Sequence, residues 1–467
     1  KHGSEKTAVP VFMFLFWFVL AEIVQGQNAN GFGSPNDSIV SDESLALRDD
    51  DIDFHYCFGG SNPGTPIHIP AVPKGYKLVS SQVMIRHGAR VPIWSLAGVP
   101  WECDENELTA VSLDVHHKVA INRLYRIKQI EGQEAMPGTC FLGQLTKLGV
   151  NQCKEVGKAL RKAYVDTGFL SPSLKASEVV VRATASVRTQ QSAESLLEAM
   201  YPPSTRKTIK VVDIGVIEHV QDDLFPNRLR CPRLGHLNKG VKHSRVMDQA
   251  VAAAHAALVT MDKYLKDTKE AGHLKHALTE PEETSKQGQG VAKKVDDVHD
   301  SDMAMGGGHW TKEMDSIRMM KCHNFALPRE MSTAVRAQVY NLSDVMWQQM
   351  FQYGPYSLAA MGHFLTTTIS GNFHKAVEHA SSPTAAAAAA APPKLHLFAA
   401  HDVTLAATMG LLRTYDGRIP PLASQVMFEL LQKEGSGSGQ GGAGKGEKEA
   451  GKGEKGAGEG EREEASF

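Results

Sequence analysis

Hydrophobic and polar positions along this chain change repeatedly between two patterns, one typical of strands and one of helices. Residues 77–85 form a mostly apolar run of strand length with no helical period, as expected for a strand buried on both faces of a sheet. Residues 178–182, 207–216 and 394–400 predict three further strands. Helical patterns separate these strands, so we expect an α/β fold with a mostly parallel sheet and helices on both of its faces.

The predicted helices have apolar residues at intervals of three or four positions. Thr146 carries the hydroxyl of an N-cap residue and precedes a helix with Leu148, Val156, Leu160 and Tyr164 at multiples of four. Further helices are predicted over residues 186–200, 354–379 and 403–412. Residues 420–432 are expected to close the ordered part of the chain.

Strand patterns disappear between residues 217 and 353, where helical patterns at 245–265 and 331–350 replace them. We interpret residues 217–353 as a helical subdomain that overhangs the site and influences substrate choice. The α/β domain then consists of residues 76–216 and 354–432.

Several segments have compositions that do not favour a packed core. Residues 266–308 and 433–467 are rich in Gly, Lys and Glu and are expected to be disordered, while residues 381–393 contain a polyalanine run expected to form a loop. Residues 27–75 predict a partly disordered lead-in, polar up to about residue 61 and then rich in proline.

An apolar run at residues 8–21 follows two lysines near the start of the chain. It falls short of the roughly 20 residues that cross a bilayer, so residues 1–26 predict a secretory signal, with an uncleaved signal-anchor as the alternative. Six cysteines without a C-x-x-C pair allow up to three disulfides and argue against a zinc site, and their pairing stays open. Glycosylation patterns begin at Asn36 and Asn341. We therefore expect a secreted, lysosomal or Golgi lumenal protein.

The net charge of −2 gives no electrostatic argument for a nucleic acid partner, and membrane contact is expected only through the N-terminal segment if it stays uncleaved. Any anion site must therefore be local. The stretch V-M-I-R-H-G-A-R-V-P at residues 83–92 predicts one, because Arg86, His87 and Arg90 follow a buried strand. Arginine offers paired donors that match phosphate oxygens, and neutral histidine can attack phosphorus.

Two other predicted strands end in residues suited to the same chemistry. Arg188 lies in the first turn of the helix after residues 178–182, and His401 and Asp402 follow residues 394–400. Groups beyond the carboxyl ends of parallel strands converge at one edge of the sheet. The sequence therefore predicts one anion pocket built from three segments.

The combined motifs resemble the histidine acid phosphatase family, a branch of the histidine phosphatases, over residues 76–432. The matching elements are R-H-G-A-R-V-P at residue 86, L-T-x-x-G at residue 145, R-T-x-x-S at residue 188, H-D at residue 401 and P-P-L-A-S at residue 420 before F-E-L. The family usually continues with another core strand after F-E-L, whereas a Gly/Lys/Glu tail follows here.

The resemblance implies a phosphomonoesterase without metal or cofactor that acts on a phosphorylated small molecule or sugar. It implies that His87 is the nucleophile, forming a phosphohistidine, and that Asp402 donates a proton to the leaving group. The implied phosphate-binding residues are Arg86, Arg90, Arg188 and His401. Because bound phosphate raises the pKa of a neighbouring carboxyl, although the arginines oppose this shift, we expect an acid pH optimum.

Several functions stay open at this stage. Glu102-Cys103 and the C-x-L-G element at Cys140 resemble the phosphoxylose phosphatase branch, which acts on the glycosaminoglycan linkage sugar, while prostatic or lysosomal acid phosphatases and phytases are alternatives. A phosphoglycerate mutase-like phosphotransferase shares the R-H-G core but is disfavoured by the H-D pair and the signal-like start. A catalytically silent phosphate-binding or glycan-binding protein is the non-enzymatic alternative.

Overall fold

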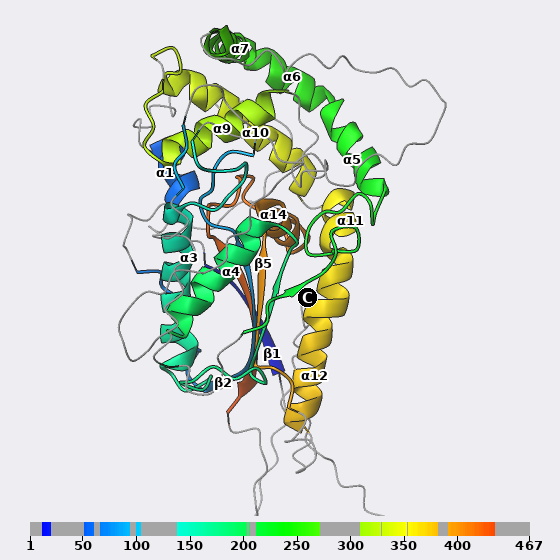
Figure 1. The fold of residues 1–467 in the computed structure, drawn as a ribbon. Helices are drawn as coiled ribbons and strands as arrows, with labels where there is room; N and C mark the ends of the chain where they lie inside the picture. The colour runs from blue at the N-terminus through cyan, green and yellow to red at the C-terminus, as the bar shows by residue number, and fades with distance from the viewer. Residues whose placement is uncertain are drawn as a thin grey trace, which may run out of the picture.

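A mixed six-stranded sheet forms the centre of the protein in the computed structural model (Figure 1). The structure describes residues 12–19, 51–59, 66–93, 100–103, 138–202, 205, 212–270, 309–327, 329–352, 354–381 and 391–434. The strand order is β1-β6-β2-β5-β3-β4. The strands are β1 Phe12–Val19, β2 Tyr76–Arg86, β3 Val179–Ala183, β4 Gly215–Val216, β5 Leu395–Ala400 and β6 Gln425–Lys433.

The four strands β2, β5, β3 and β4 run parallel, and β6 runs antiparallel to both of its neighbours. The expected mostly parallel α/β sheet is therefore confirmed. The strand predicted at residues 207–216 is shorter in the structure, since β4 comprises Gly215–Val216 and residues 206–211 lie outside the described part.

Side chains of the central strands alternate between two hydrophobic cores. Val83 and Ile85 of β2 face the core beneath α3 and α4, whereas Met84 faces the core beneath α11 and α14. Both faces of β2 are buried, because helices cover the sheet on either side (Figure 1). This explains why the strand has a mostly apolar sequence.

Three helical segments cover the first face: α3 Lys147–Leu160, the π-helical turn η1 Arg161–Val165 and α4 Val187–Met200. The predicted N-cap of α3 is confirmed, since the hydroxyl of Thr146 accepts a hydrogen bond from the backbone N–H of Gly149. Four segments lie on the other side: α11 Pro355–Phe364, η4 Leu365–Ile369, α12 Ser370–Ser381 and α14 Asp402–Leu411. Helices on both faces were expected from the sequence.

The described residues between β4 and α11 contain helices and no further strand, and the interpretation of residues 217–353 as an inserted helical subdomain stays a prediction. These helices lie above the end of the sheet at which α14 begins (Figure 1). They are α5 Arg233–Lys242, α6 Arg245–Ala253, α7 His255–Glu270, α9 His309–Cys322 and α10 Thr333–Phe351. The single helix expected at residues 245–265 is interrupted at Ala254, and α7 continues to Glu270, into the range expected to be disordered. Residues 271–308 lie outside the described part.

One helix occurs where no regular element was expected. Helix α1, Asp51–Phe58, lies inside the polar lead-in and is joined to the end of α9 by a disulfide between Cys57 and Cys322. The helix has only about two turns, which are too few to give a clear period in the sequence. Long-range contacts therefore stabilise α1, and the expectation of an irregular segment was wrong for these residues.

Two disulfides are present, not the three that six cysteines allow. Cys57 pairs with Cys322 and Cys103 pairs with Cys140, while Cys153 and Cys231 are free thiols. Disulfides persist in oxidising compartments, which agrees with the expected compartment class.

The apolar N-terminal run contributes β1, which pairs antiparallel with β6 at the edge of the sheet. The signal or signal-anchor interpretation of residues 1–26 stays a prediction. Within the described ranges, no helix combines the length and the apolar composition needed to cross a membrane. Of the two glycosylation patterns, Asn341 is an exposed residue of α10 and Asn36 lies outside the described residues.

Candidate active site

The three parallel strands β2, β5 and β3 end at the same level of the sheet. Arg86 is paired with Ala400, and Ala183 is paired with Ala399, so the residues that follow each strand emerge together. All six residues expected to form the site lie around this edge, namely Arg86, His87, Arg90, Arg188, His401 and Asp402. The convergence inferred from the strand pattern is therefore present in the structure.

Glycines allow the signature loop to pack closely against the start of α3. A side chain at Gly88 would clash with the backbone of Gly149, and a side chain at Gly149 would clash with the backbone of Ala89. The hydroxyl of Thr146 also donates to the carbonyl of Ala89 at 3.1 Å. The L-T-x-x-G element thus supports the loop that carries His87.

His87 is buried, with 2% of its surface exposed. Its Nδ1 lies 2.8 Å from the carbonyl oxygen of Gly88, and because a carbonyl can only accept, Nδ1 carries the hydrogen. Burial, followed by the positive charges of Arg188, Arg86 and Arg90, lowers the pKa of His87 well below 6.5. The ring is therefore neutral near pH 7, with its lone pair on Nε2, which has no hydrogen-bond partner in the described part of the chain.

His401 lies beside His87, with a ring centroid distance of 5.7 Å. Its Nδ1 is 3.4 Å from Nη2 of Arg188, and because a guanidinium has only donors, Nδ1 must accept. Nε2 then carries the hydrogen and donates to the Thr184 hydroxyl at 2.9 Å. These contacts hold His401 and Arg188 together at one side of His87.

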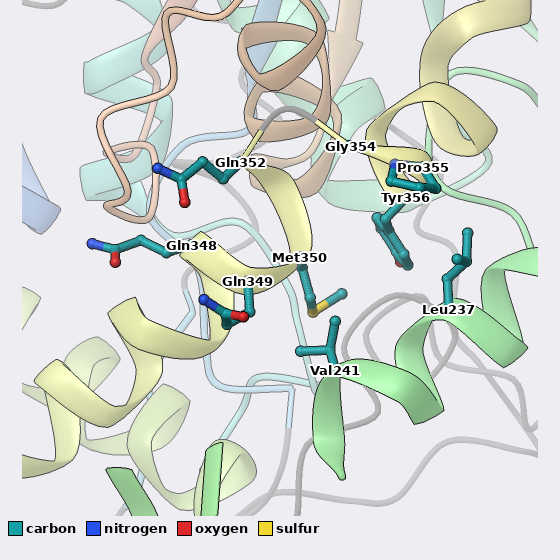
Figure 2. A pocket seen from close by; sticks show the side chains of 9 residues that line it. All are labelled: Leu237, Val241, Gln348, Gln349, Met350, Gln352, Gly354, Pro355 and Tyr356. Atoms are coloured by element: carbon teal, nitrogen blue, oxygen red, sulfur yellow. The ribbon is translucent and has the colours of Figure 1, made fainter. Parts of the chain in front are cut away.

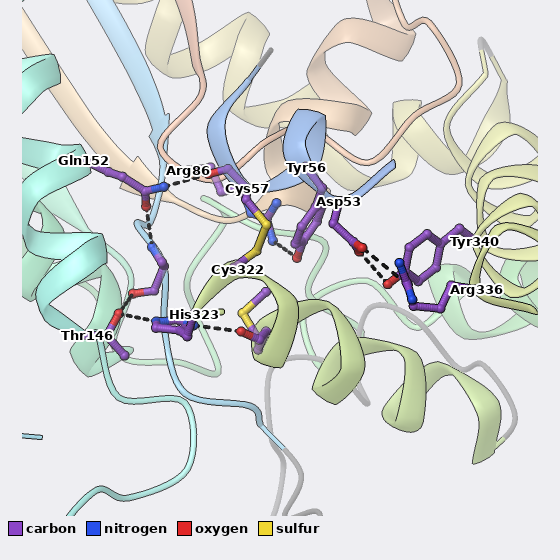
Figure 3. Close-up of a disulfide and its surroundings, with 12 residues drawn as sticks. Asp53, Tyr56, Cys57, Arg86, Thr146, Gln152, Cys322, His323, Arg336 and Tyr340 are labelled. Atoms are coloured by element: carbon purple, nitrogen blue, oxygen red, sulfur yellow. Dashed lines mark hydrogen bonds and ion pairs between the residues drawn. A yellow bond between two sulfur atoms is a disulfide. The ribbon is translucent and has the colours of Figure 1, made fainter. Parts of the chain in front are cut away.

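Arg86 is fully buried and held at both terminal nitrogens. Nη2 lies 2.7 Å from the hydroxyl of Tyr56 and 2.8 Å from Oδ2 of Asp402, and Nη1 donates to the carbonyl of Pro420. Nε is buried and has no hydrogen-bond partner. The P-P-L-A-S element therefore helps to fix the guanidinium through its first proline, as does α1 through Tyr56 (Figure 3).

Asp402 is the first residue of α14, and its Oδ1 accepts a hydrogen bond from the backbone N–H of Val403 at 2.8 Å. Burial alone raises the pKa of this carboxyl, but the positive charges of Arg86 and Arg90, together with the hydrogen bond from Val403, outweigh burial. The pKa of Asp402 is consequently below its ordinary value when the site holds no phosphate. The side chain is 20% exposed, so the carboxylate is accessible from one side.

Arg90 has a partner that was not expected from the sequence. Its Nη1 and Nη2 donate to the carboxylate of Asp315 on α9 at 3.0 and 2.8 Å. Burial lowers the pKa of Arg90, but the Asp315 charge and hydrogen bonds raise it further, so the guanidinium stays charged. Nε of Arg90 is buried without a hydrogen-bond partner. Only part of the Arg90 guanidinium is thus available to a ligand.

Two further residues contact the site and were not predicted from the sequence. Tyr56 of α1 contacts Arg86, and Asp315 of α9 contacts Arg90. Both helices are anchored near the signature loop by the Cys57–Cys322 disulfide and by His323, whose Nε2 lies 2.8 Å from the Thr146 hydroxyl (Figure 3). No local pattern marks these residues, because their positions depend on how the helical subdomain packs.

A separate cavity of about 350 Å³ lies where α5 meets the junction of α10 and α11. The side chains of Leu237, Val241, Met350 and Tyr356 surround its apolar part, while Gln348 and Gln352 point away from them (Figure 2). None of the six expected site residues lines this cavity.

Residues 77–441 match the model of the histidine phosphatase superfamily, branch 2. This chain belongs to the histidine phosphatase superfamily, branch 2. The match spans well over half of the sequence and includes all of the motifs at the sheet edge.

Three named proteins resemble this chain over most of its length. Counting factor 60 of Dictyostelium discoideum is 27% identical over 375 residues, covering 77% of this chain and 78% of the relative. The human lysophosphatidic acid phosphatase type 6 is 26% identical, and the alignment covers 76% of this chain and 74% of the relative. The human testicular acid phosphatase is 25% identical, and the alignment covers 80% of this chain and 71% of the relative. This superfamily member is a phosphomonoester hydrolase of the acid phosphatase type.

Solved structures with a similar fold include two from bacteria. Hafnia alvei phytase in complex with tartrate has 14% sequence identity and a TM-score of 0.45, covering 77% of this chain and 82% of that chain. The Bifidobacterium longum multiple inositol polyphosphate phosphatase, in complex with inositol hexasulfate, has 12% sequence identity and a TM-score of 0.45. The match covers 80% of this chain and 86% of that chain.

Proposed function

We propose that this protein hydrolyses phosphomonoesters through a phosphohistidine on Nε2 of His87, with Asp402 as the proton donor to the leaving group. The observation that carries the proposal is the state of His87: a neutral ring, its Nε2 lone pair without a partner, surrounded by three arginines. A neutral imidazole nitrogen can attack phosphorus, and the fixed positive charges beside it reduce the repulsion from the phosphate dianion.

In the first step, Nε2 of His87 forms a bond to phosphorus while the bond from phosphorus to the ester oxygen breaks. The proton on Asp402 moves to that oxygen, so an alcohol leaves and Asp402 becomes a carboxylate. In the second step, a water molecule attacks phosphorus, gives its proton to Asp402, and the bond to His87 breaks with release of phosphate.

The arginines would stabilise the equatorial oxygens of the transferring phosphoryl group. The unpartnered, buried Nε atoms of Arg86 and Arg90 support this role, because buried donors in proteins are nearly always hydrogen-bonded. Their terminal nitrogens are held by Asp402, Tyr56 and Asp315, which limits the reorganisation needed when phosphate binds. Arg188 and His401 complete the proposed clamp.

Asp402 must carry a proton when the ester bond breaks. In the site without phosphate its pKa is below the ordinary value, owing to the arginines. A bound phosphate dianion both neutralises these cations and repels the carboxylate, so it raises the pKa. An acid pH optimum follows from this sequence of events.

For the substrate we propose a phosphorylated small molecule or sugar. Phosphoxylose in the glycosaminoglycan linkage and inositol phosphates are the narrower alternatives, and the names of the mammalian relatives add lysophosphatidic acid. The Cys103–Cys140 disulfide joins the two elements that resemble the phosphoxylose phosphatase branch. Side-by-side turnover of these phosphate esters by the purified protein distinguishes them.

A silent phosphate-binding or glycan-binding protein is the alternative of another class. The neutral ring of His87 and the carboxyl of Asp402 at the same edge of the sheet support catalytic turnover rather than binding alone. For the compartment we propose the secretory pathway, with the protein secreted or retained in a lysosomal or Golgi lumen.

The test is hydrolysis of an aryl phosphate by the native protein, His87→Ala and Asp402→Asn. The proposal predicts almost complete loss with His87→Ala. Asp402→Asn should lose less activity toward esters with good leaving groups than toward alkyl phosphates, because a good leaving group needs no proton. Equal activity of all three proteins would exclude the proposed mechanism.

A further inference from the structure

Arg318, in α9, is a buried cation whose charge is not balanced by an ion pair. The residue is 6% exposed, and its guanidinium carbon lies 4.8 Å from the ring centroid of Tyr56 and 4.2 Å from that of Tyr340. Its Nε and Nη1 are buried without hydrogen-bond partners. Among the residues that the structure describes, no carboxylate forms an ion pair with it. Buried charges are normally paired, so this one calls for an explanation.

The neighbouring carboxylates are engaged elsewhere. Asp315, one turn earlier on α9, binds Arg90. Asp53 accepts a hydrogen bond from Tyr340 at 2.7 Å and lies 3.4 Å from Nε of Arg336 (Figure 3). Burial raises the pKa of Asp344 to about 6, despite the opposing charges of Arg318 and Arg418. Below about pH 6, where Asp344 is mainly protonated, none of these three carboxylates balances the charge of Arg318.

The Tyr56 ring contacts both Arg318 and Arg86, which is an expected residue of the phosphate site. The guanidinium carbons of Arg86 and Arg318 each lie 4.8 Å from the Tyr56 centroid, so they can be no further apart than twice that distance. Arg86 in turn contacts Asp402 at 2.8 Å. A small molecule with two anionic groups a few bonds apart could reach both arginines.

The Arg318 guanidinium lies over the rings of Tyr56 and Tyr340, and two of its N–H-bearing nitrogens have no hydrogen-bond partner. Aromatic rings stabilise a cation without using these donors. The unpartnered nitrogens are therefore suited to an anion that approaches in the plane of the guanidinium, and phosphate oxygens match such donors well.

We propose that Arg318 forms a second anion subsite, which recognises a second phosphate on a substrate whose first phosphate reacts at His87. This inference rests on the proposed function and assigns the substrate class: small-molecule bisphosphates, selected over the corresponding monophosphates. The helical subdomain would then contribute to substrate choice through one side chain of α9.

The experiment compares kcat/KM for a hexose bisphosphate and for the corresponding hexose monophosphate, with the native protein and with Arg318→Gln. The native protein should favour the bisphosphate by ten-fold or more, well above the statistical advantage of having two phosphates. In Arg318→Gln, the ratio of the two kcat/KM values should fall to nearly that statistical value. A matched control is Arg336→Gln, which removes another buried arginine of the same subdomain and should leave the ratio as in the native protein.

The outcomes separate the two proposals. Absence of turnover of either ester by the native protein overturns the proposed function. Turnover of both esters with a ratio near the statistical value overturns the bisphosphate subsite while leaving the proposed function standing, and it does so even if Arg318→Gln fails to fold. If Arg318→Gln folds and its ratio of kcat/KM for the bisphosphate to kcat/KM for the monophosphate stays as high as in the native protein, the proposed subsite is also excluded.

Discussion

Oδ2 of Asp402 lies 2.8 Å from Nη2 of Arg86, which joins the start of α14 to the end of β2. This ion pair links the proposed proton donor to the proposed phosphate clamp. The positive charge of Arg86 helps to keep the pKa of this carboxyl below its ordinary value while the site holds no phosphate, and in the proposed mechanism bound phosphate raises the pKa so that the carboxyl takes up a proton. In the proposed mechanism, this contact therefore couples substrate binding to acid catalysis.

The first prediction concerns the pH dependence of hydrolysis. Because the protonated form of Asp402 is the active one and its pKa is depressed in the free protein, kcat/KM should rise as pH falls below neutrality. His87 stays neutral over much of this range, since its pKa is well below 6.5. The fall of kcat with increasing pH should occur at higher pH than the fall of kcat/KM, because bound phosphate raises the Asp402 pKa. Profiles of kcat and kcat/KM for an alkyl phosphate check this, and activity that increases above neutral pH would contradict it.

The second prediction concerns Asp315. Asp315→Asn removes the charge that holds Arg90 and should lower the free energy of unfolding by about 3 kcal/mol, because it leaves a buried cation without its ion pair. We expect kcat/KM for an aryl phosphate to fall at least about ten-fold, as Arg90 loses its fixed orientation. Denaturant unfolding and steady-state kinetics measure both effects.

Glu155→Gln is the matched control for Asp315→Asn. Glu155 pairs with Lys158 on the exposed surface of α3, so its substitution should change stability and kcat/KM very little. If Asp315→Asn behaved like this control, the role of α9 in positioning Arg90 would be disproved.

The third prediction compares the two disulfides. The Cys57–Cys322 bond spans 265 residues and the Cys103–Cys140 bond spans 37, so loss of the first should be the more destabilising, by about 1–2 kcal/mol in the chain-entropy model. Only the first joins α1 to α9, which supply Tyr56 and Asp315. Replacing its two cysteines by serine should therefore also lower kcat/KM more than the same replacement in the second. Tm and kinetics of the two double variants test this, and a larger activity loss from the second would contradict it.

The fourth prediction concerns stability in acid. Burial, with a smaller effect of Lys375, lowers the pKa of His396 from 6.5 to about 4. The unfolded chain therefore binds a proton at higher pH than the folded chain, and the free energy of unfolding decreases as pH falls from about 6.5 to about 4, by up to roughly 3 kcal/mol from this residue. In His396→Gln the decrease over this window should be shallower. An unchanged pH dependence of denaturant unfolding in the variant would count against this assignment.

The parallel part of the sheet and the convergence of residues at its edge could be predicted from local sequence, whereas β1 and β6 were not predicted as strands. Strands β2, β3 and β5 were each expected to within one or two residues, because strands buried on both faces form short, continuous apolar runs. Parallel direction then brings His87 and Asp402 to one edge, whatever the length of chain between them.

The contacts that hold the site together could not be predicted in this way. Nothing in the local pattern distinguishes Asp315 from the other acidic residues among the 52 Asp and Glu of the chain. Tyr56 lies in a helix of eight residues whose position depends on a disulfide to a cysteine 265 residues away. Such contacts arise from packing of the helical subdomain onto the sheet, and hydrophobic periodicity carries no information about it.

The most direct test of the central claim is to detect the covalent intermediate on His87. Asp402→Asn should accumulate it during turnover of an aryl phosphate with a good leaving group, because the first step needs no proton and the second lacks its base. After an alkaline quench, mass spectrometry should find one phosphoryl group on the peptide that contains His87, and none in the protein that also carries His87→Ala. A phosphoryl group on another residue, or turnover by the His87→Ala protein at the native rate, would contradict the account.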